Sequence, residues 1–371
     1  KKEPAKLQPF FASILTKKPI TAVYRDVRIT GEFIFCPAYT SIILQEKEKL
    51  MQSQNPGKCL EEIVTWKKMR EGAENGKGKG MEFIGLGAYT SIFDNVVRQM
   101  CGTGLSEVVD VHTTQGSSYT AMSAYLGIRE ASEKMGISLK DSVVSVVGAA
   151  GSIGTLFTQL IAPDVKVVNL VGRQDSEFSR KKLEQTKRIA ESYAKSREKN
   201  PDIQAVQDYD ILKKSDIVVC TTSSGGNLLR ASQFKKGTIL GNISVPSDLS
   251  DDVYNREDLL VAELGLNLVP ENVDLGLTEK YHIELPPNVL YACAAQTICA
   301  TLEKKSTGDL SIFKKLRESS IIRPQTAYYT KSLAEKYGFK TALVCKDRIL
   351  GDNNFERVKR NAGRFVIGFG N

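Results

Sequence analysis

A short glycine turn places the strongest constraint on how this chain folds. The apolar run Val143–Val147 leads directly into Gly148-Ala149-Ala150-Gly151-Ser152-Ile153-Gly154, and an apolar stretch of helical character continues to Ile161. Glycine permits a tight turn and a close approach of the backbone to a ligand. The N-terminus of the following helix offers N–H groups and a positive dipole end to phosphate groups. The pattern predicts a strand, a phosphate-binding turn and a helix, and therefore a dinucleotide site. The alternative is a glycine-rich turn that only packs a helix on a strand.

The residues around this turn alternate between strand and helix patterns. Apolar strands are predicted at Val165–Val171, Ile217–Cys220 and Thr238–Leu240, and a charged amphipathic helix at Phe178–Arg197. Parallel strands need crossover connections, so the alternation predicts a Rossmann-type, doubly wound, largely parallel sheet. We place this nucleotide-binding domain at residues 141–285.

The chain is long enough for a second domain. At about 100–200 residues per domain, 371 residues predict two. We expect residues 1–140 to form an α/β substrate domain, and residues 286–371 to contribute a cysteine-bearing helix and a segment that packs back on it. Within these parts the patterns predict strands in Ile20–Phe35, Phe83–Gly87 and Val108–Val111, a turn at 88–91, a flexible loop at Gly72–Gly80, a polar loop at His112–Thr120, and helices at Glu61–Arg70, Ala121–Met135, Asn288–Lys304 and Gln325–Tyr337.

The end of the second predicted strand bears on the choice of dinucleotide. A carboxylate there would bind the ribose 2′-hydroxyl of NAD, whereas an arginine accommodates the 2′-phosphate of NADP. The strand ends in Val171-Gly172-Arg173, and the nearest carboxylate, Asp175, lies past the strand end. Arg173 therefore favours NADPH as the cofactor, with Arg180 and Lys181 as further basic residues. The alternative for Arg173 is an ordinary exposed charge beside a helix.

Two polar loops follow the next predicted strands. Thr221, Thr222 and Ser223 follow one strand, and Ser244 and Val245 follow the next. Ligands of open α/β sheets bind beyond the carboxyl ends of the strands. We therefore expect both loops to border the nicotinamide.

Composition excludes several classes of protein. The chain has seven cysteines without a CxxC motif and only two histidines, His112 and His282, so neither a disulfide framework nor a multi-histidine metal site is expected. No apolar run reaches the ~18–20 residues of a membrane-spanning helix, and the first residues lack the apolar core of a signal peptide. We therefore expect a cytoplasmic protein. Its net charge of +8 suggests acidic partners.

A cysteine stands in the first turns of a predicted helix. The segment Leu285–Thr297 contains two prolines followed by Cys293. A cysteine in a helix is more often a small buried apolar residue than a nucleophile. The residues around it leave both interpretations open.

Several segments, in order, resemble the long-chain acyl-[acyl-carrier-protein] reductases, which form fatty aldehydes. The similar stretches span roughly residues 83–340 and are Gly85–Ile92, Thr113–Ala121, Val146–Gly154, Ile217–Val219, Val245–Ser247, Tyr291–Ala294 and Lys336–Lys340. The glycine turn is generic, and the ordered combination with the cysteine helix is more specific.

The resemblance implies a reaction and roles for particular residues. It implies that Cys293 attacks the thioester of a long-chain acyl-carrier protein or acyl-CoA, and that NADPH reduces the resulting enzyme thioester to a fatty aldehyde. A helix N-terminal turn lowers the pKa of a cysteine thiol, which this step needs. Side chains and backbone N–H groups around Ser117 would bind the oxyanion; the candidates are Thr113, Thr114, Ser117 and Ser118. Where the family carries a histidine this chain has Tyr119, which is either a catalytic substitute or a packing residue, and His112 lies just upstream.

Other functions stay open beside this one. The chain is alternatively a related NADP-dependent reductase of another acyl or carbonyl substrate, or a non-catalytic NADP-binding partner subunit. The basic residues of the helix at 178–199 either receive an acidic carrier protein or form a solvated face with i,i+4 carboxylate pairs. Nucleic-acid binding is not expected, because aromatic residues do not alternate with the basic ones. Peripheral contact with a membrane and the oligomeric state are left open.

Overall fold

The computed structural model describes residues 19–33, 40–173, 177–224, 226–276, 285–316 and 322–363. The chain divides into two compact units. The first comprises Lys1–Gln115, Pro270–Ile283 and Thr297–Arg317, and the second comprises Gly116–Val269, Glu284–Gln296 and Glu318–Asn371. Along the described ranges, no helix combines the length and the apolar character that crossing a membrane requires.

The second unit is built on a mixed sheet with a Rossmann core. Its path runs β14-β13-β10-β9-β8-β5-β6-β7, with β12 also paired to β10. The six strands from β10 to β7 are parallel neighbours, which confirms the predicted largely parallel, doubly wound sheet. Their bounds are β5 Val143–Val147, β6 Val167–Val171, β7 Asp202–Val206, β8 Ile217–Cys220, β9 Ile239–Asn242 and β10 Leu260–Leu268.

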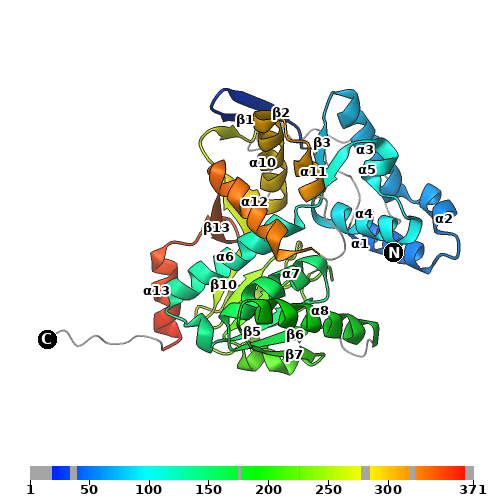
Figure 1. Ribbon diagram of the computed structural model, residues 1–371. Coiled ribbons are helices and arrows are strands. Elements are labelled where there is room, and N and C mark those ends of the chain that lie inside the picture. Colours follow the sequence, from blue (N-terminus) through cyan, green and yellow to red (C-terminus); the bar gives the residue numbers. More distant parts are fainter. Residues whose placement is uncertain are drawn as a thin grey trace, which may run out of the picture. The chain divides into compact units, whose positions relative to one another are not determined.

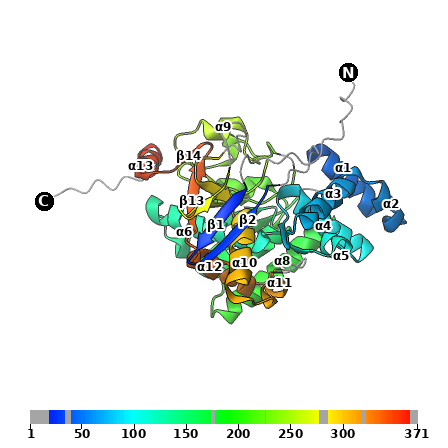
Figure 2. The same ribbon diagram turned by 90° about the horizontal axis from the view of Figure 1, so that it is seen from above.

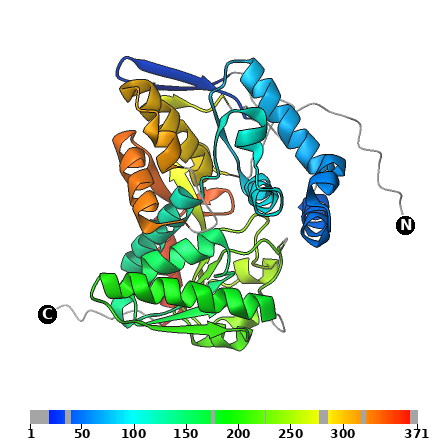
Figure 3. The same ribbon diagram turned by 45° about the vertical axis from the view of Figure 1, so that its right-hand side comes forward.

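One face of this sheet is covered by helices packed side by side. α7 (Ser152–Ile161) and α8 (Glu177–Ser196) lie over the strands β5 to β7 (Figure 1, Figure 3). α6 (Ser117–Met135) packs on α7 and on β10, and α12 (Pro324–Lys336) packs on α6 (Figure 2). Gly241 of β9 allows this close packing, because a Cβ there would lie 3.1 Å from the side chain of Ile128 in α6.

Short helical segments are part of the apolar core on the opposite face. Along each strand, residues that face these segments alternate with residues that face the helices; they include Val147, Val218 and Leu240. They pack with η3 (Tyr209–Lys214), η4 (Ala231–Gln233) and α9 (Asp251–Tyr254). Alternate residues of a strand point to opposite faces, so a sheet covered on both sides reads as continuous apolar runs. This explains why its strands were recognisable in the sequence.

Three further strands extend the sheet beyond β10. β12 (Val289–Tyr291) and β13 (Lys340–Cys345) pair antiparallel with β10, and β14 (Arg348–Ile349) pairs with β13. α13 (Asp352–Asn361) follows and packs on α6, where Lys134 forms an ion pair with Asp352 at 3.3 Å.

The first unit has its own sheets and its own core. Strand β1 pairs antiparallel with β2 and β11, and β3 pairs parallel with β4. Its core is lined by Trp66, Phe93, Leu105 and their apolar neighbours. The elements are β1 Ile20–Tyr24, β2 Val27–Gly31, α1 Thr40–Gln52, α2 Pro56–Glu62, α3 Val64–Gly78, β3 Phe83–Gly85, α4 Ala88–Cys101, α5 Leu105–Val109, β4 His112–Thr114, β11 Val273–Asp274 and α11 Ser311–Lys315. Helix α10 (Ala292–Thr307) begins in the second unit and ends in the first.

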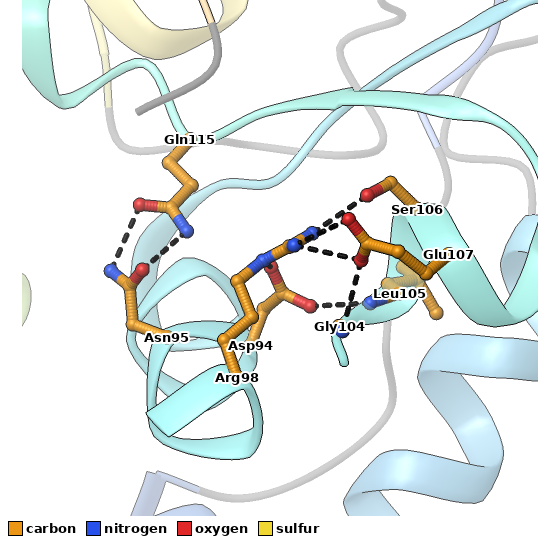
Figure 4. A network of polar contacts seen from close by, with 8 residues as sticks. All are labelled: Asp94, Asn95, Arg98, Gly104, Leu105, Ser106, Glu107 and Gln115. Atoms are coloured by element: carbon orange, nitrogen blue, oxygen red, sulfur yellow. Dashed lines mark hydrogen bonds and ion pairs between the residues drawn. The ribbon is translucent and has the colours of Figure 1, made fainter. Parts of the chain in front are cut away.

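A polar network connects α4 to the residues around α5 in this unit (Figure 4). Asp94 is fully buried and accepts hydrogen bonds from the Leu105 amide at 2.7 Å and from Arg98 Nε at 3.0 Å. Arg98 also contacts both carboxylate oxygens of Glu107, at 2.8 and 2.7 Å. Burial raises the pKa of Glu107, but hydrogen bonds from Arg98, the Gly104 amide and the neighbouring serine, together with the charge of Arg98, outweigh it and lower the pKa to about 2.

Four sequence predictions at residues 72–120 are wrong. Gly72–Gly80 is not a loop, because α3 continues to Gly78 and buries Ala73 and Gly76. The expected turn at 88–91 is the start of α4, and most of the expected strand Val108–Val111 belongs to α5 or its cap. In each case tertiary packing outweighs a local preference. The expected polar loop His112–Thr120 is also replaced, by β4 and the first turn of α6.

Candidate functional site

The predicted glycine turn connects β5 to α7 as expected. Gly148 has φ +82°, a conformation that favours glycine, and its amide donates to the Val171 carbonyl at 2.9 Å. A Cβ on Gly148 would lie 3.0 Å from backbone atoms of Thr221 and Thr222. The turn is therefore pressed against the loop that follows β8.

The two other glycines of the turn have different surroundings. A Cβ on Gly154 would lie 2.6 Å from the Gly148 carbonyl oxygen and 2.7 Å from Thr221 Oγ1, so glycine is needed for α7 to pack on the turn. Gly151 is exposed, has an ordinary φ of −76° and would place a Cβ no closer than 3.4 Å to its neighbours. Packing therefore does not require a glycine at position 151. A glycine there is instead explained by the close approach of a pyrophosphate to the backbone. Ala150, Ser152 and Ile153 are half-buried between them.

Arg173 stands at the end of β6 with its backbone held on both sides. Its amide donates to Ser179 Oγ at 3.1 Å, and its carbonyl accepts from Gln207 Nε2 at 2.6 Å. The residue itself is exposed. Asp175, which the sequence placed past the strand end, lies outside the described residues. Of the further basic residues, Lys181 pairs with Glu177 at 2.8 Å, as the solvated-face alternative predicts.

The loops after β8 and β9 lie at the carboxyl edge of the sheet, as predicted. Thr221 donates from Oγ1 to the Val147 carbonyl at 3.0 Å, and Thr222 and Ser223 follow it half-buried. In the second loop Ser244 is buried, whereas the Val245 side chain is 50% exposed and precedes a cis proline bond. Sequence reasoning missed Asp248, a buried carboxylate that receives hydrogen bonds from both loops; no local pattern distinguishes it from a surface aspartate.

The predicted nucleophile lies against the start of α6. Cys293 is half-buried near the start of α10, and a Cβ on Gly116 would lie 2.3 Å from both Cα and Cβ of Cys293. Gly116 has φ +67° and precedes Ser117, the first residue of α6. The backbone of the cysteine is therefore packed directly on the residue that begins a 19-residue helix.

Gln296 fixes the first turn of α6 from the same helix as the cysteine. Its Oε1 accepts from the Tyr119 amide and from Ser118 Oγ, both at 3.0 Å. The Tyr119 hydroxyl donates to Asn267 Oδ1 at 2.7 Å, and its side chain is buried. These contacts favour the packing alternative for Tyr119. Sequence reasoning missed both amide residues, since neither stands in a recognisable motif.

The predicted oxyanion donors divide between the two units. Ser117 and Ser118 are buried in the first turn of α6, whereas Thr113 and Thr114 belong to β4 of the first unit. His112 is also in β4, where its ring stacks on Phe313 with centroids 3.8 Å apart. His282 lies outside the described residues.

Comparison with known proteins concerns the second unit. Residues 129–264 match the family model of the shikimate / quinate 5-dehydrogenases. Among solved structures, shikimate 5-dehydrogenase from Listeria monocytogenes, in complex with shikimate and NAD, is 16% identical over 38% of this chain and 52% of that chain, with a TM-score of 0.29. The Δ1-pyrroline-2-carboxylate reductase of Thermococcus litoralis, in complex with NADH and L-proline, is 14% identical over 36% and 40%, with a TM-score of 0.27. The nucleotide-binding domain of glutamyl-tRNA reductase from Thermoplasma volcanium is 16% identical over 37% and 84%, also with a TM-score of 0.27.

The family match supports a pyridine-nucleotide domain of the dehydrogenase type. The matched residues run from within α6 to β10 and include the glycine turn and both polar loops. The chain spans about half the length of the Listeria enzyme and 40% of the Thermococcus enzyme. The family match and the geometry of the second unit are therefore the features that bear on function.

The resemblance to long-chain acyl-[acyl-carrier-protein] reductases is wrong. The family model that matches, over residues 129–264, is that of the shikimate / quinate 5-dehydrogenases. Three of the similar stretches, Val146–Gly154, Ile217–Val219 and Val245–Ser247, lie in the matched region, where the glycine turn and strand ends of a dinucleotide-binding domain produce similar residue strings. Such strings therefore report the kind of domain rather than the substrate.

Proposed function

We propose that this chain is an NADP-dependent reductase of a carbonyl or acyl substrate. The observation that carries the proposal is the glycine turn between β5 and α7, within a match to a dehydrogenase family. Its outer glycines are needed by the fold, while its exposed middle glycine keeps the backbone open. This arrangement fits a bound pyrophosphate better than a turn that serves packing alone.

The residues of the turn and of the two loops would hold the cofactor. The N-terminal amides of α7 would bind the pyrophosphate, since a helix N-terminus favours anions. The half-buried Thr222 and Ser223 and the exposed Val245 would border the nicotinamide. When bound, NADPH supplies the hydride for reduction of a carbonyl carbon.

Arg173 supports the choice of NADP over NAD. Its backbone is fixed by Ser179 and Gln207, while the residue is exposed at the strand end where a 2′-phosphate is bound in this fold. A guanidinium binds phosphate by paired, charge-assisted hydrogen bonds.

Cys293 and Ser117 are our candidates for residues that contact the substrate. Both lie at the N-terminus of α6, where the helix dipole stabilises negative charge that develops on a carbonyl oxygen. The close approach of Gly116 holds the cysteine backbone in this position.

Cofactor binding is the first test. Titration with NADPH and NADH, followed by the fluorescence of the reduced nicotinamide, should show tighter binding of NADPH. Arg173→Ala should weaken NADPH binding about tenfold and leave NADH unchanged, as expected for one charge-assisted contact. Arg188→Ala, an exposed arginine in α8, is the matched control. Binding of neither nucleotide to the wild type would overturn the proposal.

Turnover separates an enzyme from a binding protein. NADPH oxidation would be followed with a panel of aldehydes, ketones and acyl thioesters, comparing the wild type with Cys293→Ala. Consumption by the wild type and a loss of at least about 100-fold in kcat/KM in the variant is the expected result. Tight NADPH binding without oxidation across the panel would support a non-catalytic NADP-binding protein instead.

A further inference from the structure

Asp248 is a fully buried carboxylate that binds three hydroxyl groups from two loops. Its Oδ1 accepts hydrogen bonds from Thr222 Oγ1 at 2.8 Å and Ser224 Oγ at 2.9 Å. Its Oδ2 accepts from Ser244 Oγ at 2.6 Å. Among the residues that the structure describes, no lysine or arginine forms an ion pair with it. Hydroxyl groups alone thus satisfy a buried carboxyl group, which is costly to bury otherwise.

The three hydroxyl groups come from positions two to four residues past the strand ends. Thr222 and Ser224 follow β8, and Ser244 follows β9. Farther along, the same loops are joined through the backbone, because the Leu229 amide donates to the Asp248 carbonyl at 2.8 Å. Close to the strand ends, the two loops are therefore joined by side-chain hydrogen bonds to Asp248. This is the part of each loop that lies at the carboxyl edge of the sheet.

A second buried layer holds Asp248 itself. Asn242 Oδ1 accepts from the Asp248 amide at 3.3 Å, and Asn242 Nδ2 donates to the Ser244 carbonyl at 2.9 Å and to Glu263 at 2.5 Å. Glu263 also accepts from the Tyr254 hydroxyl at 2.6 Å. Asn242 thus holds the backbone of both Asp248 and Ser244, as expected around a residue that acts through geometry.

We infer that Asp248 is a positioning residue, which sets the geometry of the two loops that bind the nicotinamide half of the cofactor. This inference rests on the proposed function and gives Asp248 an indirect role, through the hydroxyl groups that it binds. In a doubly wound fold the strands β5 to β7 form one mononucleotide-binding half and β8 to β10 the other. Loss of Asp248 should therefore affect one half of the cofactor site and spare the other.

Two ligands distinguish the halves. NADPH occupies both, whereas 2′,5′-ADP carries only the adenosine half with its 2′-phosphate. The variant Asp248→Asn keeps the volume but replaces one acceptor oxygen by an amino group, so the hydroxyl groups of at least one loop lose their acceptor. Asp248→Asn should raise the Kd of NADPH about tenfold and change the Kd of 2′,5′-ADP less than about twofold. Asp251→Ala, an exposed aspartate nearby, is the control.

Ser224→Ala is the milder variant, in case the buried substitution prevents folding. Ser224 is exposed, and the substitution removes one of the three hydroxyl groups that donate to Asp248. It should raise the Kd of NADPH by about two- to threefold and leave the Kd of 2′,5′-ADP unchanged. An equal loss of both ligands in a folded variant, or no loss of either, would overturn the inference. A wild-type protein that binds neither ligand would instead overturn the proposed function.

Discussion

The glycine turn allows stability and cofactor binding to be separated by two single substitutions. In Gly154→Ala the new methyl group would lie 2.6 Å from the Gly148 carbonyl oxygen, 2.7 Å from Thr221 Oγ1 and 2.8 Å from Ala149 Cα. Two of these atoms belong to the backbone, so the strain cannot be relieved by a side-chain rotation. We expect the free energy of unfolding to fall by about 1–3 kcal/mol, as for other overpacked sites. At about 2–4 °C per kcal/mol, Tm falls by about 2–12 °C.

Gly151→Ala is the matched substitution in the same turn. The methyl group would meet nothing closer than 3.4 Å, and the φ of −76° suits alanine. We expect Tm to change by at most about 1–2 °C, because alanine is a poorer N-cap than glycine but lowers the conformational entropy of the unfolded chain, which offsets about 0.4–1 kcal/mol of that cost. NADPH binding should nevertheless weaken at least about tenfold, since the methyl group obstructs the approach of the pyrophosphate.

Differential scanning calorimetry and NADPH titration of both variants test this reasoning. The two substitutions should change different quantities: Tm falls mainly in Gly154→Ala, while Gly151→Ala loses affinity without losing stability. A Gly154→Ala protein as stable as the wild type would refute the packing argument. Undiminished NADPH binding by Gly151→Ala would refute the assignment of the turn to the pyrophosphate.

Three other predictions concern the surroundings of the site and the first unit. Gly116→Ala should destabilise the protein by at least about 3 kcal/mol, because φ is +67° and the methyl group would overlap the backbone of Cys293; calorimetry measures this. Tyr119→Phe should cost about 1–2 kcal/mol, because the buried Asn267 Oδ1 would keep only the longer hydrogen bond from Ser123 Oγ at 3.5 Å, yet leave kcat within about twofold in the NADPH assay. The pKa of Glu107, lowered to about 2, makes its stabilisation complete above pH 4.5 and lost as pH falls from 4.5 to 2. Because its side chain is one-third exposed, the wild type should lose only about 1–2 kcal/mol more than Glu107→Gln over this range, measured by urea unfolding with the single tryptophan as the probe.

Each of these has a control in the same chain. Gly136→Ala has nearly the same φ, +66°, and open space around its Cβ, so it should show only the cost of the backbone conformation. A Gly116→Ala protein no less stable than Gly136→Ala would contradict the close approach to the cysteine. A large loss of kcat in Tyr119→Phe would restore the catalytic alternative. For the pH series, Glu74→Gln removes an exposed carboxylate whose ion pair should contribute little.

The nucleotide-binding half was predictable because its signals are local. Strand β5 begins and ends at the predicted residues, as does β8, since strands covered on both faces are uninterrupted apolar runs. The glycine turn was recognisable for the same reason: its three glycines stand in one short segment, directly after strand β5 and before helix α7.

The first unit was predicted less well because packing determines its helices. α3 carries several glycines that locally favour a loop, but Trp66, Met69, Ala73 and Gly76 form one buried face at helical spacing. That periodicity was present in the sequence, but the prediction of a loop gave more weight to the glycine and lysine content of the segment. The part played by Asp248 was not predictable at all, because its three hydroxyl partners come from two loops and are brought together only by the sheet.

The mixed sheet has a consequence for synthesis of the chain. β10 is bonded on one side by β9, which precedes it, and on the other by β13, which follows it. About 70 residues separate the end of β10 from the start of β13. At about 5–20 residues per second, the ribosome leaves that edge uncovered for roughly 4–14 s. An apolar strand with an unpaired edge can pair with a strand of another chain. The nascent nucleotide-binding half is therefore exposed to such pairing until β13 has been synthesised and has paired with β10.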